Sequence, residues 1–579
     1  MKDTIMNLQE RMKERNWGGV LIPSEDFHQS EYVGEHFRAR AHFSGFTGSA
    51  GTLLVTLKGA YLWTDGRYFI QAARELEGSG ISLMKMGEEG VPSLLEFIER
   101  EGISPLAVDG RCISVDLGRK LSELTELHFD EDPLEGLWNP PDFPQAPVWI
   151  LKEEYAGLSA GEKLAKIRKT MAEQGAAAHL LTSLDDIAWL LNLRGGDMVH
   201  EPLFLSFLIL EAEGGRLYAG ADSFSEEVLA YLADLGITLA PYGDIVRGIS
   251  EMEGKVLLDP DKLGYTFYRA ISGEKVEGMN PTALLKAVKN PVEVENFKKA
   301  HLYDAIAWVK FFHWLKTTDL NGETEWSSAK KLEGLRGEVA SYVAPSFESI
   351  SAYGPNGAIV HYAPTAEVHA PLQPRGLYLS DTGGDYLEGS TDITRTVALG
   401  PVTEEEKRDF TLVLKGHIGL AQGVFPRGIS GYALDVLARG PLWRAHKDFN
   451  HGTGHGVGYL TNIHEGPVGF GRVAKSATSL KLWPLEVGNI VTNEPGLYIE
   501  GKYGIRLENC MAVRDDGEGF LAFDQLTLVP FDLDALAPEL LSQGERDYLN
   551  GYHKQVYEAL APHLDGEVLE FLKEATRPI

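Results

Sequence analysis

Two stretches in the C-terminal part of the chain share one layout, and this repetition restricts the possible folds more than any other feature. In the first stretch, an apolar strand ends at Asp381, a glycine-rich turn follows, and a second strand contains Asp392. In the second stretch, Glu494 and Glu508 stand at the matching places. Apolar runs joined by a glycine-rich turn are typical of β-hairpins. We therefore expect two halves of one pseudo-symmetric domain, each supplying a pair of carboxylates.

The four carboxylates predict a metal site. Acidic side chains that converge in an apolar interior repel one another, and taking them out of water is costly. A pair of divalent cations removes both problems. Carboxylate oxygens together with one imidazole suit a hard or borderline ion, so Mn²⁺ is favoured, with Co²⁺ or Zn²⁺ as alternatives.

Taken singly, these acidic residues also have structural explanations. Asp381 beside Gly383 is an ordinary turn aspartate, and Glu494 before Pro495 is an ordinary turn entry. The metal hypothesis therefore depends on the joint pattern and not on any single member of it.

A histidine pair, His451 and His455, has the spacing of the HExxH zinc helix. Gly452 stands where that motif has glutamate, and glycine alternates through residues 451–458, which disfavours a helix. These glycines do not form GxGxxG, and the chain contains no GxxxxGK[ST] loop. Neither a zinc-helix protease nor a nucleotide-binding protein is expected.

An internal repeat occupies the N-terminal half. Each copy has a short apolar strand, a polar turn, a helical stretch and a glycine-bearing loop, followed by alternating strands. This pattern predicts two related α/β domains in tandem. The first copy comprises residues 20–27, 43–49, 52–56 and 60–64, and the second comprises residues 179–187, 191–195, 204–210 and 216–219.

Two breaks divide the chain. Residues 139–147 are too rich in proline for regular structure, and residues 289–293 precede a long helical pattern. At 579 residues the chain is also too long for a single core. We therefore predict two N-terminal α/β domains and a catalytic domain with a C-terminal extension, at residues 1–150, 151–290 and 291–579.

Two helices are predicted in the third domain. Leu302, Ile306 and Val309 recur at spacings of three and four, which marks one buried helix face. Thr403, with Glu406 three residues later, forms a capping box that begins a second helix.

Composition limits the partners and the compartment. The chain has 84 acidic and 54 basic residues, for a net charge of −30, which disfavours nucleic acid. Its 2 cysteines, Cys112 and Cys510, exclude a disulfide framework. The first residues lack the apolar core of a signal peptide, and no apolar run approaches the ~18 residues of a membrane span. We expect a cytoplasmic protein without a membrane segment.

Several motifs together resemble the "pita-bread" metallopeptidases, which include methionine aminopeptidase, prolidase, aminopeptidase P and the metal-free creatinase. These motifs are HGTGHGVG at 451–458, HEGP at 464–467, NEPG at 493–496 and GIRLEN at 504–509. Upstream, the chain resembles the long, three-domain form of aminopeptidase P, so that the resemblance covers nearly the whole sequence. The upstream segments are residues 22–24, 28–32, 44–51, 63–68 and 186–195, and the C-terminal stretch around Tyr552 and His553 carries the same resemblance.

The resemblance implies an α/β (α+β) fold, with two creatinase-like domains followed by a pita-bread domain that binds two metal ions. Asp392 and Glu508 would bridge the metals, Asp381 would hold one of them, and His455 and Glu494 would hold the other. A hydroxide activated by the dinuclear centre would attack the peptide carbonyl, and Glu494 would shuttle the proton.

The resemblance also implies substrate contacts. His361 and His464 would bind the substrate and stabilise the tetrahedral oxyanion. His451 would line the proline pocket, and Arg506 would orient the bridging carboxylate. Arg67, in the first domain, resembles a substrate-contacting arginine.

The implied activity is removal of the first residue from peptides with proline at position two, by a homodimer. The main alternative is a prolidase, which cleaves only dipeptides. A non-catalytic peptide-binding module is disfavoured because such modules lose metal ligands, and a creatinase is disfavoured because it needs none. Asn493 and Leu497 stand where family members often have aspartate and an aromatic residue. We expect these two differences to change the rate or the substrate preference without abolishing activity.

Overall fold

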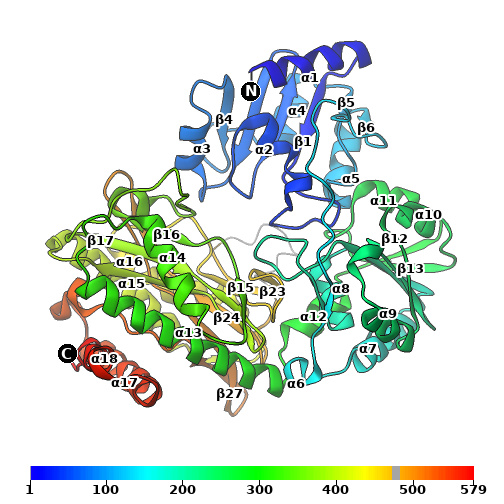
Figure 1. The fold of residues 1–579 in the computed structure, drawn as a ribbon. Helices are drawn as coiled ribbons and strands as arrows, with labels where there is room; N and C mark the ends of the chain where they lie inside the picture. Colours follow the sequence, from blue (N-terminus) through cyan, green and yellow to red (C-terminus); the bar gives the residue numbers. More distant parts are fainter. Residues whose placement is uncertain (1, 473–482) are drawn as a thin grey trace. The chain divides into compact units, whose positions relative to one another are not determined.

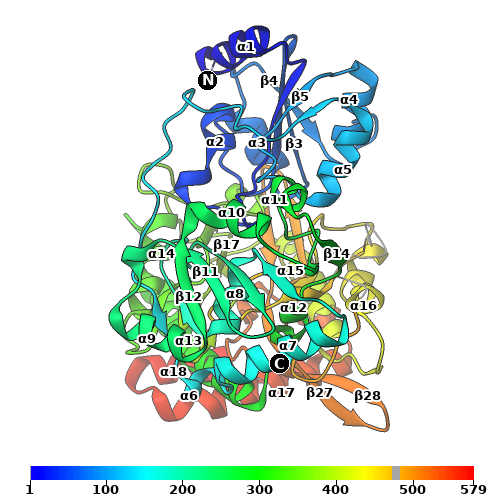
Figure 2. The same cartoon turned by 90° about the vertical axis from the view of Figure 1, so that its right-hand side faces the viewer.

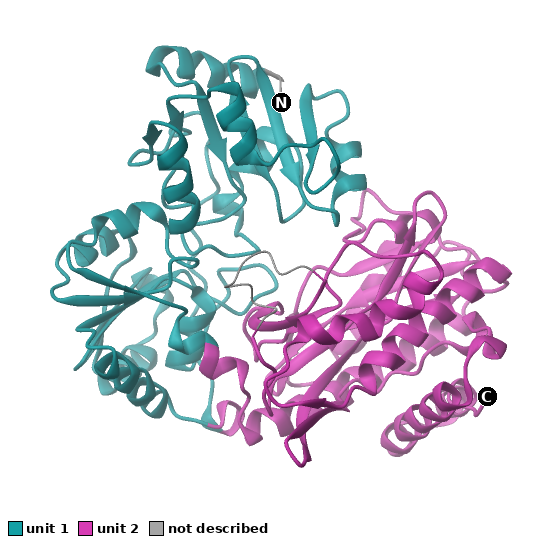
Figure 3. Ribbon diagram, turned by 180° about the vertical axis from the view of Figure 1, so that it is seen from behind, with its two compact units in different colours: residues 1–153, 158–283 teal, residues 154–157, 284–579 magenta. Residues whose placement is uncertain are grey.

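The computed structural model describes residues 2–472 and 483–579, which form two compact units (Figure 3). Unit 1 comprises Met1–Glu153 and Leu158–Ala283, and unit 2 comprises Glu154–Gly157 and Leu284–Ile579. Within the described residues, no helix combines the length and the apolar composition needed to cross a membrane.

Unit 1 contains two six-stranded sheets, with strand orders β4-β3-β2-β1-β5-β6 and β12-β11-β10-β8-β13-β14. The first sheet consists of β1 (Gly19–Ile22), β2 (Thr52–Thr56), β3 (Gly59–Thr64), β4 (Ile81–Lys85), β5 (Leu106–Ala107) and β6 (Leu127–His128). The second consists of β8 (Ala178–Leu181), β10 (Ser206–Glu211), β11 (Gly215–Ala219), β12 (Ile237–Pro241), β13 (Lys255–Leu258) and β14 (Glu274–Glu277).

The two sheets have the same connectivity. In the first, β1 pairs antiparallel with β2 and β2 with β3, whereas the outer pairs β3–β4, β1–β5 and β5–β6 are parallel. In the second, β8, β10 and β11 are antiparallel neighbours, and β12, β13 and β14 add in parallel. This repeat confirms the prediction of two related α/β domains in tandem.

Helices pack on these sheets through apolar faces, and several begin at a side-chain cap, for example the Ser93–Glu96 capping box of α4. The helices of unit 1 are α1 (Lys2–Arg15), α2 (Ala39–Ser44), α3 (Phe69–Glu75), α4 (Leu94–Glu101), α5 (Val115–Leu124), α7 (Ala160–Glu173), α8 (Leu184–Leu191), α9 (Glu226–Asp234), α10 (Ile245–Ser250) and α11 (Tyr265–Ala270).

Unit 2 begins with α13 (Pro291–Thr317), whose start is fixed by the capping box of Asn290 and Glu293. The helix α13 packs with α14 (Glu325–Arg336), and α15 (Glu404–Ala421) packs with α16 (Gly431–Arg444). Figure 1 shows these helices beside the strands of the same unit, with α17 (Gln543–Leu560) and α18 (Gly566–Ala575) at the C-terminal end. The predicted capping box of Thr403 and Glu406 is confirmed at the start of α15.

The first half of unit 2 carries the first acidic pair. Its main strands, β17 (Leu377–Thr382) and β20 (Ile393–Ala398), are antiparallel neighbours in a sheet with β16 (Ile350–Tyr353). Between them the chain forms a small hairpin of β18 (Gly384–Tyr386) and β19 (Gly389–Ser390), which pairs with β15 (Tyr342–Pro345).

The second half repeats this plan. Its main strands, β24 (Ile490–Asn493) and β27 (Asn509–Gly517), are antiparallel, and a small hairpin of β25 (Gly496–Ile499) and β26 (Tyr503–Arg506) lies between them in sequence. The strand β27 continues into a hairpin with β28 (Phe520–Gln525), which is visible in Figure 2. The same sheet contains β21 (Phe425–Pro426), β22 (Gly454–Gly456) and β23 (Glu465–Phe470).

The predicted hairpins need one correction. Asp381 lies in β17, but Asp392 lies immediately before β20 and not within a strand, because the chain leaves the sheet to form β18 and β19 first. Glu494 and Glu508 likewise directly follow β24 and directly precede β27. The acidic residues thus lie at the points where each inserted hairpin leaves or rejoins the main strands.

Candidate metal centre

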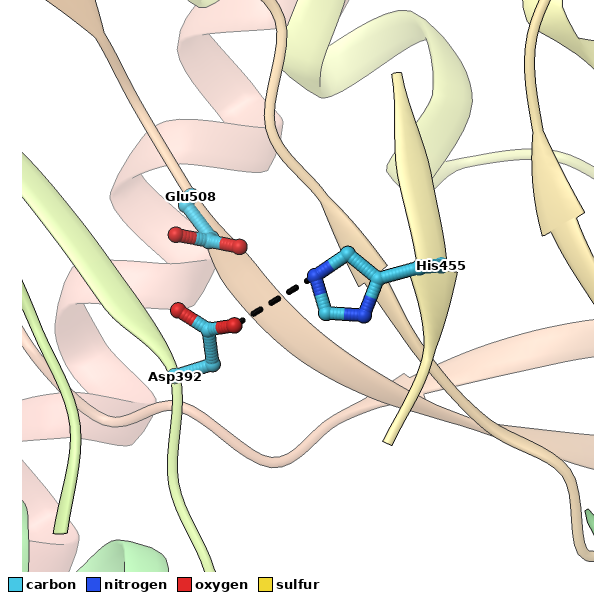
Figure 4. A group of neighbouring side chains, drawn as sticks. All are labelled: Asp392, His455 and Glu508. Carbon is cyan, nitrogen blue, oxygen red and sulfur yellow. Dashed lines mark ion pairs between the residues drawn. The ribbon is translucent and has the colours of Figure 1, made fainter. Parts of the chain in front are cut away.

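Three ligand-type side chains from distant parts of unit 2 meet in one place. Candidate ligand atoms of Asp392, His455 and Glu508 all lie within 4.8 Å of one another. Figure 4 shows the two carboxylates facing the imidazole ring. His455 Nε2 lies 3.4 Å from Asp392 Oδ2 and 3.7 Å from Glu494 Oε1. The structure therefore brings four of the five predicted ligands together directly.

His455 is oriented by its own backbone. It lies in β22, and its Nδ1 is 2.8 Å from the carbonyl oxygen of Gly456. Because a carbonyl oxygen can only accept a hydrogen bond, Nδ1 carries the hydrogen of the neutral ring, and the lone pair is on Nε2, which faces the carboxylates (Figure 4). A histidine held through its other ring nitrogen is the usual arrangement for a metal ligand.

Backbone and hydroxyl groups fix the two central carboxylates. Thr394 Oγ1 donates to Glu508 Oε2 at 2.6 Å, and the Glu508 amide donates to the Thr394 carbonyl at 3.0 Å. Cys510 Sγ donates to the carbonyl oxygen of Asp392 at 3.3 Å. The first and second halves of unit 2 are therefore joined directly at the acidic cluster.

Asp381 is held by Arg506, which donates from Nη2 and Nε to Asp381 Oδ2 at 2.5 and 3.1 Å. The other oxygen, Oδ1, is buried and has no hydrogen-bond partner among the described residues. A buried carboxylate oxygen without a donor is costly unless a cation or water meets it. This orphaned atom is what a metal ligand at this position requires.

The electrostatics of the cluster also fit a metal. Burial, and then the neighbouring carboxylates, raise the pKa of Asp392 and of Glu508 well above their usual values. Burial, and then the charge of Glu508, raise the pKa of Glu494 to about 7. The acidic groups thus outnumber the positive charges that the protein supplies, and divalent cations would restore the ionised forms.

Arg506 links the cluster to the predicted proline pocket through a residue that the sequence analysis missed. Arg506 Nη1 donates to the hydroxyl oxygen of Tyr498 at 2.7 Å, and the Tyr498 hydroxyl lies 2.7 Å from His451 Nε2. His451 Nδ1 donates to the Gly452 carbonyl at 2.6 Å, so Nε2 accepts from Tyr498. The sequence signal that could have identified Tyr498 is its position two residues after the NEPG motif.

Two further predicted histidines lie near these groups. The His464 ring packs edge-on against His455, with ring centroids 4.3 Å apart. His361 follows Val360, whose carbonyl oxygen accepts a hydrogen bond from Arg506 Nη2 at 3.3 Å. His464 therefore contacts the metal cluster directly, and His361 directly follows a residue that Arg506 binds.

Arg67 belongs to unit 1 and not to the metal-bearing unit. Its guanidinium donates to Asp65 at 2.9 and 2.8 Å and lies 3.4 Å from Glu31. Burial by itself lowers the pKa of Arg67, but the hydrogen bonds to Asp65 and the neighbouring acidic groups outweigh it and raise this pKa above its usual value. Its contact with substrate stays a prediction.

The two departures from the family pattern lie in packed positions. Asn493 is buried, and its Nδ2 donates to the His417 carbonyl at 2.9 Å. Leu497 is buried in the main core of unit 2. Neither forms part of the cluster of candidate ligands.

Comparisons with known protein families divide the chain into four matches. A profile described as creatinase/prolidase N-terminal domain matches residues 5–130, and a second with the same description matches residues 139–293. Metallopeptidase family M24 matches residues 295–515, and the C-terminal region of peptidase M24 matches residues 519–579.

Two curated relatives match from end to end. A probable Xaa-Pro aminopeptidase P of Neurospora crassa is 38% identical over 613 aligned residues, which cover 100% of this chain and 89% of the relative. One of Sordaria macrospora is also 38% identical and covers 100% of this chain and 99% of its own.

Two solved structures resemble this chain, one over its whole length and one over about two thirds of it. The X-prolyl aminopeptidase of Caenorhabditis elegans, described as a cytosolic enzyme with a di-nuclear active site, has a TM-score of 0.95 and 32% identity, covering 100% of this chain and 99% of its own. A prolidase from Thermococcus sibiricus has a TM-score of 0.52 and 26% identity and covers 65% of this chain and 99% of its own.

Proposed function

Because this chain belongs to the Xaa-Pro aminopeptidase P group of metallopeptidase family M24, we propose that it removes the first residue of peptides whose second residue is proline. It is a metal-dependent hydrolase of the exopeptidase type, and its substrates are peptides. A single observation carries the proposal: Asp392, His455 and Glu508 converge within 4.8 Å, with Glu494 beside them.

Two divalent metal ions are the proposed cofactors. Asp392 and Glu508 would bridge them, Asp381 would bind one, and His455 and Glu494 would bind the other. Mn²⁺ fits this oxygen-rich set best, with Co²⁺ or Zn²⁺ as alternatives. When bound, the ions would activate a water molecule and polarise the peptide carbonyl.

The chain's own groups supply the remaining chemistry. Glu494, whose carboxylate lies 3.7 Å from His455 Nε2, would accept and return the proton during the reaction. His361 and His464 would bind the substrate and donate hydrogen bonds to the developing oxyanion. His451 would line the proline pocket, held in its tautomer by Tyr498.

Two supporting groups complete the proposed site. Arg506 would orient the carboxylate of Asp381 while it holds Tyr498. Arg67 would contact the substrate from the first domain.

The compartment, the domain boundaries and the oligomeric state are also proposals. We place the enzyme in the cytoplasm, divide it at residues 1–150, 151–290 and 291–579, and expect a homodimer. Support for self-association comes from α16, whose Tyr432, Val436 and Trp443 have exposed fractions of 44%, 49% and 43%. Apolar side chains in such number on one exposed helix are typical of an interaction surface.

A peptide panel tests the activity. The purified protein should release the first residue of an Xaa-Pro-Xaa tripeptide and should leave an Xaa-Ala-Xaa tripeptide intact. A chelator should stop the reaction, Mn²⁺ should restore it, and elemental analysis should find two metal ions per chain.

The same panel separates the alternatives. An intact tripeptide together with a cleaved Xaa-Pro dipeptide would identify a prolidase. Absence of both metal and cleavage would support a binding module instead.

A further inference from the structure

Glu325, the first residue of α14, is a carboxylate with an exposed fraction of 0%. All of the hydrogen bonds recorded to its side chain among the described residues come from uncharged donors, and none comes from a lysine, arginine or histidine. Burial of a carboxylate without a cation is costly unless its lone pairs are satisfied. The positive end of the α14 dipole offsets part of that cost, and the rest requires donors.

Four groups of one loop supply these donors. The amide of Tyr353 donates to Oε1 at 2.6 Å, and Asn356 Nδ2 lies 3.1 Å from Oε1 and 3.2 Å from Oε2. The hydroxyl of Tyr362 and the amide of Ala370 donate to Oε2 at 2.7 and 2.6 Å. An ionised carboxylate offers about four acceptor sites, so this set saturates it.

The tethered loop carries His361. It begins with the 3-10 helix η4 (Gly354–Ala358) and continues through two turns, in which Ile359 N–H donates to the Asn356 carbonyl and Tyr362 N–H to the Ile359 carbonyl, each at 3.0 Å. His361 therefore lies directly beside the residue whose hydroxyl is bound to the buried carboxylate.

The loop has a second attachment on the side of the metal cluster. Arg506 Nη2 donates to the carbonyl of Val360, and the same guanidinium holds Asp381. Glu325 thus holds both ends of the loop, and Arg506 holds its middle. The position of His361 relative to Asp381 is set by these two anchors.

From these contacts we infer that Glu325 is a positioning residue for His361. The inference rests on the proposed function, in which His361 binds the substrate and stabilises the oxyanion. A displacement of about 1 Å in a group that acts on the transition state costs about a hundredfold in rate. Glu325 prevents that displacement without touching the substrate itself.

A double-mutant cycle tests this role. In Glu325→Gln, an NH₂ group replaces one carboxylate oxygen. Because NH₂ cannot accept hydrogen bonds from the surrounding donors, the loop that carries His361 loses part of its attachment. We expect kcat on an Xaa-Pro-Xaa tripeptide to fall by about ten- to a hundredfold, with unchanged metal content. In the His361→Ala background, the same substitution should cause no further fall, because the positioned group is gone.

Asp532→Asn is the matched control. Asp532 is a carboxylate with a side chain only 9% exposed, accepting from the Ala398 amide at 2.7 Å and pairing with Lys316 at 2.9 Å, and no hydrogen bond joins it to the described His361 loop. It should lower the melting temperature without the kcat effect. If Glu325→Gln does not fold, Tyr362→Phe removes one of the four donors and enters the same cycle.

Three outcomes would contradict the inference, the role of His361 or the proposed function. An equal fall in both backgrounds, or a wild-type kcat in Glu325→Gln beside an inactive His361→Ala, would refute positioning and leave the proposed function intact. Wild-type activity of His361→Ala would overturn both the role of His361 and the inference. Failure of the unmodified protein to cleave the tripeptide would overturn the proposed function itself.

Discussion

At the scale of single residues, Glu508 is the most constrained member of the metal cluster. Its side chain accepts from Thr394, and its amide donates back to the Thr394 carbonyl. Burial, followed by the charges of Asp392 and Asp381, raises its pKa. This fixed position and raised pKa support the proposed role of Glu508 as a bridging metal ligand.

Glu508→Gln should keep the fold and lose the metal centre. Substitution of a residue that only hydrogen-bonds a ligand costs about 10- to 100-fold in metal affinity, and loss of the ligand itself should cost at least as much. We expect activity to fall at least a hundredfold. Calorimetric titration with Mn²⁺ measures the affinity, and circular dichroism checks the fold.

Glu518→Gln, at an exposed position of the β27–β28 turn, is the control and should behave as the unmodified protein. Retention of two tightly bound metal ions by Glu508→Gln would contradict the bridging role.

The residues named by motifs were recognisable in the sequence, whereas those that act through hydrogen bonds were not. Asp392, His455 and Glu508 stand in distinctive glycine-rich segments, and the structure brings them together. Glu325 stands at the start of a helix, where acidic residues are common for dipole reasons alone. Its partners from Tyr353 onward become neighbours only through the fold, so no local pattern distinguishes it.

At the scale of elements, the loop that carries His361 depends on close packing against β26. A Cβ atom on Gly504 would lie 1.7 Å from the carbonyl oxygen of Gly357, and one on Gly357 would lie 2.8 Å from the Gly504 amide nitrogen. Two backbones thus meet where any side chain would separate them. The contact keeps η4 against the strand that leads to Arg506.

Gly504→Ala should lower stability because the added methyl has no room. Overpacking of this kind costs about 1–3 kcal/mol. Gly551→Ala, in the open middle of α17, should instead raise stability by up to about 1 kcal/mol, since alanine favours helix and nothing lies within 4 Å of its Cβ. Differential scanning calorimetry measures both. An unchanged or raised stability of Gly504→Ala would show that Gly504 is not limited by packing.

Most elements followed from periodicity and caps, and the exception has a physical cause. The strand pairs β2–β3 and β10–β11 and the start of α15 lie where the sequence predicted them. The excursion of β18 and β19 was missed because β18 bonds to β15, a distant segment, and β19 bonds only to β18 among the described strands. Pairing with a distant strand does not change the local alternation of apolar and polar residues, so it cannot be read from the sequence. Asp392 was therefore assigned to a strand that begins one residue later, at Ile393.

At the scale of the whole molecule, α16 presents apolar side chains on two faces. Leu434, Ala438 and Leu442 are buried, while Tyr432 and Trp443 are 44% and 43% exposed. A surface helix of a monomer is expected to be polar on its outer face. The outer face of α16 is therefore the surface we assign to contact with a second copy.

Trp443→Glu should convert the proposed dimer to a monomer, because a charge at a desolvated interface centre costs several kcal/mol. Sedimentation or light scattering should give about twice 63.7 kDa for the unmodified protein and about 63.7 kDa for the variant. Leu229→Glu, at an exposed apolar position of α9, should leave the mass unchanged. A monomeric unmodified protein would rule out the dimer.

The acidic residues lie at the ends of strands in both halves of unit 2, so the proposed metal site would be completed late in synthesis. Neither half owns a complete set of donors, and the last one, Glu508, directly precedes β27. During synthesis from the N-terminus, Asp381 and Asp392 leave the ribosome before Glu494 and Glu508 do. With the proposed ligand set, a complete pair of metal ions would therefore require both halves of unit 2 and could not be held by the first half alone.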